Sequence, residues 1–357
     1  MLVSIQSPLY RTSHMILSSE KWRIIIMTGL EELTGCIKKL SADAVNTILD
    51  AVKMLLASEN TTDIPDCPYC SSTKAIRYGH KCGKQRFRCK QCGRTFVTTT
   101  HTIMSQSHFS EAVWQEVISD TVHGNAIDHS AKKLGINHRT VFDMRHKILL
   151  ALQELPETEH ILLDGVSELD ETFVLDCYKG KPLADTAGRK ARKHGAKAQK
   201  RGISNEYVCI CTGIERKGDA YAATANRAKP DAGELTGLFA EHIARGTLVL
   251  CDGLKSYHSL PAATGCTVKD CHGLTEEERS FFNLNTVNGF HSFIKHRYEF
   301  YRGVATKFLN RYNALFAASY NNADALVKQM CRALLNVGST DHYHSSRDVQ
   351  ELRLLVV

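Results

Sequence analysis

The chain has 357 residues, which suits two or three domains better than one. Apolar residues make up 43% of it, so a large core is possible, and the net charge of +7 is only mildly basic. The 13 cysteines are an odd number, and the sequence carries no secretion signal; this disfavours a disulfide framework and favours reduced thiols in a cytosol. No apolar run approaches the ~18 residues of a membrane span, so we expect no membrane partner.

The N-terminal region, residues 1–60, is expected to be an extension followed by helices. Apolar residues recur at threes and fours only after Met27, which predicts one or two amphipathic helices over residues 28–58. We therefore expect residues 1–26 to be an upstream extension and Met27, in place of Met1, to be the natural start.

Residues 61–100 are punctuated by cysteine and glycine and are expected to form a zinc ribbon. Two Cys-x-x-Cys knuckles are separated by 18 residues, which is the spacing of a four-cysteine zinc site. Four thiolates close a tetrahedral shell, so the zinc is expected to be structural and to supply the folding energy of this short module. Cys82 lies outside the pattern and is expected to be a packed thiol. The predicted zinc ligands are Cys67, Cys70, Cys89 and Cys92.

The same ribbon carries many basic side chains with aromatic residues between them, and its one acid between residues 66 and 97 is Asp66. Cationic side chains on a rigid ribbon match a phosphate backbone, which favours contact with nucleic acid over a merely solvated surface. The residues expected to bind DNA here are Lys84, Arg86, Arg88, Lys90 and Arg94.

Residues 105–155 return to helical periodicity and are expected to form a helix-turn-helix segment that binds DNA. Ser110 can cap a first helix, and a turn at residues 135–137 separates helices expected over residues 126–134 and 138–150. A plain three-helix linker is the alternative, but the position directly after a basic module favours DNA binding. The side chains expected to face the major groove are Asn137, His138, Arg139, Thr140 and Arg145.

The pattern changes to strands near residue 166, which predicts a mixed α/β domain over residues 160–325 and a C-terminal tail at residues 326–357. We expect strands over residues 166–174, 206–214, 218–224 and 247–251, and helices over residues 233–244, 285–297 and 306–320.

Two aspartates on these strands are candidate metal ligands. Asp170 lies inside an apolar, β-branched strand, and Asp252 directly follows a short buried strand. Burying a carboxylate is costly unless it binds a cation, and Mg²⁺ prefers one or two carboxylates together with substrate oxygens. Each aspartate alone is weak evidence, because a strand-end Asp is often only a turn residue.

A basic run at residues 179–201 contains one acid, Asp185. Charge runs are usually solvated, but a run beside a nuclease site favours a mobile DNA clamp. The clamp residues that we expect to contact DNA are Arg189, Lys190, Arg192 and Lys193.

Four strings of the chain follow one another in a recognisable order. They are residues 168–174 (ELDETFV), Cys251-Asp252-Gly253 with Tyr257, residues 285–295 (NTVNGFHSFIK) and residues 306–313 (TKFLNRYN). In this order they resemble bacterial insertion-sequence DDE transposases with an N-terminal zinc ribbon, the insertion-sequence 1595-like group. The resemblance covers about residues 65–322 and implies a ribonuclease H-like core.

The resemblance also implies a ligand set. Asp170, Asp252 and Asn288 would hold two magnesium or manganese ions, and Lys295 would position a DNA phosphate. Related DDE transposases usually have a glutamate at the position of Asn288, and asparagine lacks its negative charge. Some members of the family, however, combine an asparagine here with a lysine seven residues further on. His291, one turn after Asn288, is either a further ligand or a packed side chain, and Glu299 is a rival third carboxylate.

The implied activity is that of a transposase, which binds insertion-sequence ends in double-stranded DNA as a homodimer or larger assembly. The chemistry would be two-metal phosphoryl transfer, with cleavage and then strand transfer. Two alternatives remain open at this point. One is a transcription regulator, for which the ribbon and helix-turn-helix would suffice, and the other is a decayed transposase that binds DNA without cutting it.

Overall fold

The computed structural model describes residues 64–333, apart from residues 82, 154, 156–159, 179–196 and 302. Several predictions lie outside these residues. They are the N-terminal extension and helices of residues 1–60, the packing of Cys82, the clamp residues Arg189, Lys190, Arg192 and Lys193, and the tail from residue 334 onward.

The cysteine-rich module is a small antiparallel sheet of strands β1 (Ala75–Lys81), β2 (Lys84–Cys89) and β3 (Thr95–Val97), in that order. Phe87 and Phe96 face each other across β2 and β3, with ring centroids 5.6 Å apart. Only five residues form its buried apolar cluster, so the module has little core of its own: Cys67, Ala75, Phe87, Cys89 and Phe96. The small core agrees with the expectation that a metal ion supplies the folding energy.

Three helices follow, namely α3 (Glu111–Val122), α4 (Ile127–Leu134) and α5 (His138–Gln153). Ser110 caps α3 as predicted, because its hydroxyl accepts the backbone N–H of Val113. Gly135 ends α4 with a φ of 65°, a left-handed conformation that glycine adopts at little cost. The helix boundaries therefore agree closely with those predicted from the sequence.

The remaining chain is built on a five-stranded mixed sheet. Its strands are β4 (Val166–Leu175), β5 (Tyr207–Glu215), β6 (Ala220–Arg227), β7 (Leu248–Cys251) and β8 (Thr267–Asp270). They lie in the order β6-β5-β4-β7-β8, with β4, β5 and β6 antiparallel and with β7 and β8 parallel to β4. A three-stranded meander extended by two parallel strands beside its first strand is a ribonuclease H-like arrangement, as expected.

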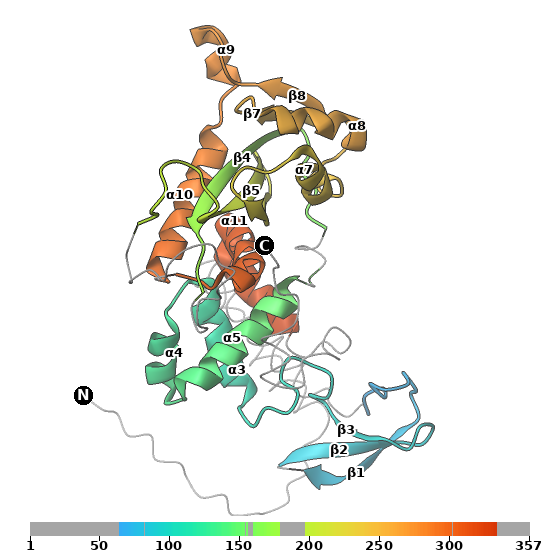
Figure 1. The fold of residues 1–357 in the computed structure, drawn as a ribbon. Coiled ribbons are helices and arrows are strands. Elements are labelled where there is room, and N and C mark those ends of the chain that lie inside the picture. The colour runs from blue at the N-terminus through green and yellow to red at the C-terminus, as the bar shows by residue number, and fades with distance from the viewer. Residues whose placement is uncertain are drawn as a thin grey trace, which may run out of the picture. The chain divides into compact units, whose positions relative to one another are not determined.

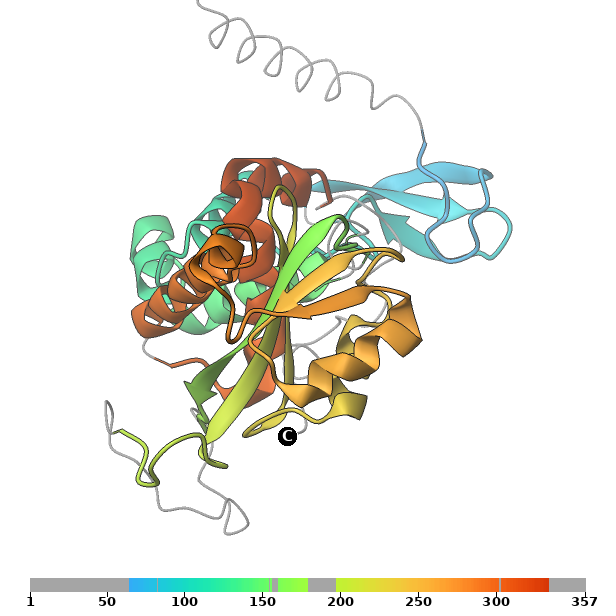
Figure 2. The ribbon, with the colours of Figure 1, turned by 90° about the horizontal axis from the view of Figure 1, so that it is seen from above.

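Helices cover both faces of this sheet (Figures 1 and 2). Alternate residues of β5 separate the two faces: Val208 and Ile210 join one apolar cluster, and Cys209 and Cys211 join the other. The first cluster includes helices α10 (Asn285–Phe300) and α11 (Leu309–Ala333), and the second includes α7 (Ala232–Phe239) and the 3₁₀ turn η2 (Lys255–Ser259).

Some elements were not predicted from the sequence. They are β8, the short helices α8 (Leu260–Thr264) and α9 (Glu276–Phe281), and the 3₁₀ turn η3 (Thr306–Phe308) within an expected helix. Each is six residues or shorter, so none shows enough periodicity to be recognised. In addition, α11 continues through residue 325, where we expected the catalytic domain to end.

Candidate active site

The register of two parallel strands places the predicted aspartates side by side. The last registered pair of β4 and β7 is Glu168 with Leu250, so Asp170 and Asp252 each lie two residues beyond it. Gly253 then turns the chain away with a φ of 88°, and Asp252 accepts the N–H of Leu254 at 3.0 Å. The two predicted aspartates therefore meet where β7 ends beside the middle of β4.

A third carboxylate joins them, and the sequence did not identify it. Carboxylate oxygens of Asp170, Glu171 and Asp252 lie within 4.8 Å of one another. Glu171 follows Asp170 on β4, so its side chain starts from the opposite face of the sheet, where Tyr257 lies. Glu171 was missed because the sequence pattern does not show how far a glutamate side chain reaches around the edge of a strand.

Burial makes these carboxylates costly to ionise. It raises the pKa of Asp170 to about 6 and that of Glu171 to about 7, and the neighbouring carboxylates add to both shifts. Oε1 of Glu171 is buried with no hydrogen-bond partner among the described residues. Two half-buried carboxylates and the exposed Asp252, all mutually repelling, fit a divalent cation, which would offset the repulsion and the lost hydration.

Helix α10 crosses β4 on the Asp170 face of the sheet. His291, 5% exposed, extends from α10 so that its Nδ1 lies 3.7 Å from Oδ2 of Asp170. Its Nε2 lies 2.6 Å from the hydroxyl of Thr212, which itself donates to the backbone carbonyl of Asp170 at 2.8 Å. His291 is therefore directed at the carboxylate cluster rather than packed away from it.

The start of α10 is held by Glu168, a fully buried residue on the same face of β4. Its carboxylate accepts the backbone N–H groups of Thr286 and Val287, at 2.8 and 3.0 Å, and the Thr286 hydroxyl at 3.0 Å. Arg216 donates to the same carboxylate at 2.8 Å and to the backbone carbonyls of Phe281 and Asn283. Glu168 and Arg216 thus join β4, β5 and the segment that leads into α10.

The other predicted ligands lie along α10. Asn288 is exposed one turn before His291, and Lys295 is exposed one turn after it. Lys295 opposes the rise in the pKa of Asp170, so its ammonium acts on that carboxylate. Glu299, the rival third carboxylate, lies exposed near the end of α10, eight residues beyond His291.

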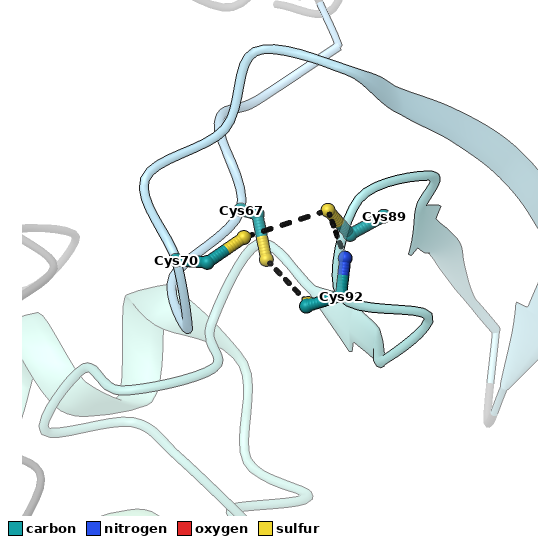
Figure 3. Close-up of side chains that lie close together, drawn as sticks. All are labelled: Cys67, Cys70, Cys89 and Cys92. Carbon is teal, nitrogen blue, oxygen red and sulfur yellow. Dashed lines mark hydrogen bonds between the residues drawn. The ribbon is translucent and has the colours of Figure 1, made fainter.

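The four predicted cysteines converge on one point (Figure 3). Sγ of Cys67 lies 3.6 Å from that of Cys92, Sγ of Cys70 lies 3.6 Å from that of Cys89, and all four sulfurs lie within 4.8 Å of one another. The backbone N–H of Cys92 is the main cause that lowers the pKa of Cys89 to about 6. Four convergent thiols with a stabilised thiolate fit a tetrahedral zinc ion.

The ribbon also presents its basic side chains around tyrosines. The guanidinium carbons of Arg86 and Arg88 lie 4.9 and 5.4 Å from the ring centre of Tyr78, and that of Arg94 lies 4.8 Å from the ring centre of Tyr69. Among the predicted DNA contacts, Arg88, Lys90 and Arg94 are exposed, whereas Lys84 and Arg86 are half-buried.

The predicted contacts of the helical segment divide into two groups. Asn137, His138 and Arg139 are exposed at the start of α5, and Thr140 is half-buried. Arg145, by contrast, is 0% exposed: it donates to the backbone carbonyl of Asn125 at 2.6 Å and lies 5.8 Å from the ring centre of Tyr301. The prediction that Arg145 faces the major groove is therefore wrong, because the residue packs inside the domain.

Comparisons with known proteins agree with this arrangement. Residues 162–321, which contain the carboxylate cluster and α10, match the family described as an ISXO2-like transposase domain. The chain is 26% identical over 255 residues to an uncharacterised protein in transposable element ISH50 of Halobacterium salinarum, covering 70% of this chain and 83% of that protein.

A solved structure, a pre-cleavage Mos1 transpososome, aligns with 90% of this chain and 99% of its own chain at 10% identity. The TM-score is only 0.21, so the ribonuclease H-like assignment rests on the strand order of the sheet. Within the part of the chain that the structure describes, no helix is both long and apolar enough to cross a membrane.

Proposed function

We propose, from the match of residues 162–321 to an ISXO2-like transposase domain, that this chain acts as an insertion-sequence 1595-like DDE transposase, which binds insertion-sequence ends and catalyses metal-dependent DNA cleavage and strand transfer. One observation carries the catalytic part of the proposal. Asp170, Glu171 and Asp252 bring carboxylate oxygens within 4.8 Å of one another where β7 ends beside β4. A DNA-binding regulator has no need of such a cluster.

The roles of the side chains follow from their positions. Asp170, Glu171 and Asp252 would together hold the divalent ions, magnesium or manganese. Asn288 would offer a neutral carbonyl oxygen from α10, and Glu171 would supply the negative charge that an asparagine lacks. When bound, the ions would activate the attacking water or 3′-hydroxyl and stabilise the leaving oxygen.

Lys295 is proposed to position a DNA phosphate. Its ammonium is exposed on α10 and acts on the carboxylate of Asp170, so a phosphate beside that carboxylate would lie within its reach. A lysine that neutralises a phosphate near bound cations would also help to hold the strand in one orientation for in-line attack.

DNA recognition is proposed to reside in the N-terminal modules. A zinc ion held by Cys67, Cys70, Cys89 and Cys92 would make the ribbon rigid, and Arg88, Lys90 and Arg94 would contact phosphates. The start of α5, with its exposed Asn137, His138 and Arg139, would enter the major groove. Joining two ends requires at least two catalytic domains on DNA, so we propose a homodimer or larger assembly in the bacterial cytoplasm.

The experiment that tests this function is an in vitro cleavage assay. Purified full-length protein is incubated with DNA that carries the element's ends, in the presence of Mg²⁺ or Mn²⁺, and nicks are mapped. We expect nicks at defined ends, lost in Asp170→Ala and Asp252→Ala although both variants still bind the ends. Cleavage retained by either variant would reject the assigned site, and binding without any nick by the unchanged protein would favour a regulator or a decayed transposase.

A further inference from the structure

We infer that His291 is a nitrogen ligand of the cation bound at Asp170, so that the catalytic centre is a mixed carboxylate and imidazole site. The inference rests on the proposed function, because it concerns the same cation. It assigns to His291 a direct role that neither the family match nor the pattern of acidic residues requires.

The first step is the direction of the side chain. His291 is 5% exposed and lies on the turn of α10 that crosses β4, with Nδ1 3.7 Å from Oδ2 of Asp170. Buried polar side chains normally have hydrogen-bond partners, and 3.7 Å is too long for such a bond. Nδ1 therefore faces the carboxylate of Asp170 without being hydrogen-bonded to it.

The second step is the position of the ring proton. The Thr212 hydroxyl donates its one proton to the backbone carbonyl of Asp170 at 2.8 Å, so toward His291 it can only accept. At 2.6 Å, Nε2 of His291 must then be the donor. In a neutral imidazole this leaves Nδ1 with its lone pair, and that lone pair faces Asp170.

The third step is the separation of the two facing atoms. Two ligand atoms that each lie ~2.1 Å from one metal ion are ~3.0 Å apart at a right angle and ~4.2 Å apart on opposite sides. The observed 3.7 Å lies between these limits, so one ion can contact both atoms.

The fourth step concerns the choice of metal. Carboxylates suit Mg²⁺ and Mn²⁺ alike, whereas imidazole nitrogen suits transition metals. A site with one imidazole among oxygen ligands should therefore prefer Mn²⁺ over Mg²⁺ more strongly than an all-oxygen site does. Thr212 contributes by fixing the tautomer and the ring orientation, which is the usual task of the hydrogen-bond partner of a metal-bound histidine.

The test is electron spin-echo envelope modulation on Mn²⁺ bound to the full-length protein, which detects nitrogen nuclei coupled to the metal. We expect ¹⁴N modulation from an imidazole in the unchanged protein, replaced by ¹⁵N modulation when histidine alone is ¹⁵N-labelled. The modulation should disappear in His291→Gln, and Mn²⁺ affinity should fall at least tenfold. Thr212→Val, which keeps the shape but lacks the hydroxyl, should weaken Mn²⁺ binding by ~10–100-fold.

His296→Gln is the matched control, because His296 is an exposed histidine on the same helix. It should leave both the modulation and the Mn²⁺ affinity unchanged. Histidine modulation absent from the unchanged protein, or retained in His291→Gln, would overturn the inference. If His291→Gln does not fold, the ¹⁵N-labelled unchanged protein still decides. If the protein binds Mn²⁺ and cleaves DNA but shows no histidine modulation, only this inference is refuted. If the protein does not cleave DNA, the proposed function is refuted.

Discussion

Arg216 donates from Nε to Oε1 of Glu168 at 2.8 Å, and this ion pair joins the strand that carries Asp170 to the start of α10. Glu168 is 0% exposed, whereas the Arg216 side chain is 29% exposed. Glu168 also accepts two backbone N–H groups of α10, at residues 286 and 287, which have no partner within the helix itself. The pair thus connects two of the elements that supply the proposed metal ligands, β4 and α10.

The first prediction follows from this connection. Glu168→Gln removes the buried negative charge and leaves Arg216 uncompensated, so we expect the free energy of unfolding to fall by about 3–5 kcal/mol. Urea denaturation followed by circular dichroism measures the change. DNA cleavage should fall more than binding to the ends does, because α10 is no longer held against β4.

The matched control for Glu168 is another acidic helix cap in the same domain. Asp231 caps α7 through a capping box and is not part of the proposed site. We expect Asp231→Ala to lower the free energy of unfolding by only about 1 kcal/mol and to retain cleavage. Equal losses in the two variants would show that Glu168 acts as an ordinary cap.

The second prediction concerns pH. Burial raises the pKa of Asp170 to about 6 and that of Glu171 to about 7, so below pH 7 at least one of these groups holds a proton. A cation must displace that proton, and the apparent affinity for Mg²⁺ should therefore rise with pH and level off above pH 7. Calorimetric titration at pH 6 and pH 8, in buffers of different ionisation enthalpy, measures both the affinity and the released protons. An affinity independent of pH would contradict a site built on these two carboxylates.

The third prediction concerns the four-cysteine site. Metal binding to such sites contributes ~10–16 kcal/mol in isolated modules, so Cys70→Ser should lose one equivalent of zinc and lose binding to DNA ends. The sheet of the larger domain should remain folded. Atomic absorption measures the zinc content, and fluorescence anisotropy measures the binding to DNA ends.

Cys271→Ser is the control for the cysteine substitution, because Cys271 is a half-buried free thiol that follows β8. It should keep one zinc ion per chain and unchanged DNA binding. Zinc retained in Cys70→Ser would show that the four cysteines do not form one closed site.

The fourth prediction concerns the exposed basic face of the ribbon. Arg88→Ala should weaken DNA binding and lower the slope of log K against log salt concentration by about 0.9, the effect of one lost phosphate contact. Arg245→Ala, which removes an exposed arginine outside the N-terminal modules, should leave the slope unchanged. An unchanged slope in Arg88→Ala would mean that this face does not contact phosphates.

Local patterns were the most predictable part of this protein. The spacing of Cys67, Cys70, Cys89 and Cys92 sufficed to group them, because each knuckle brings two sulfurs together within one turn. The meeting of Asp170 and Asp252 was also predictable, since both were expected on neighbouring strands of the same sheet.

Contacts between distant parts of the chain were not predictable in the same way. In the sequence, Glu168 is only an acidic residue within a predicted strand. Its hydrogen bonds to the backbone N–H groups of residues 286 and 287 depend on how α10 crosses the sheet. Arg145 reads as a basic residue on a candidate recognition helix, yet packing beside Tyr301 buries it. In both cases the decisive partner lies more than a hundred residues away, where periodicity and spacing carry no information.

The pairing of β4 with β7 has a consequence for how this fold can vary. The distance between Asp170 and Asp252 is set by the parallel register at Glu168 and Leu250, and the number of residues that connect the strands does not enter it. Insertions or deletions in the connecting loops can therefore change the surface that meets DNA while the two carboxylates stay opposite each other. A slip of one residue between β4 and β7, by contrast, would move one carboxylate along the strand by ~3.3 Å and divide the cluster.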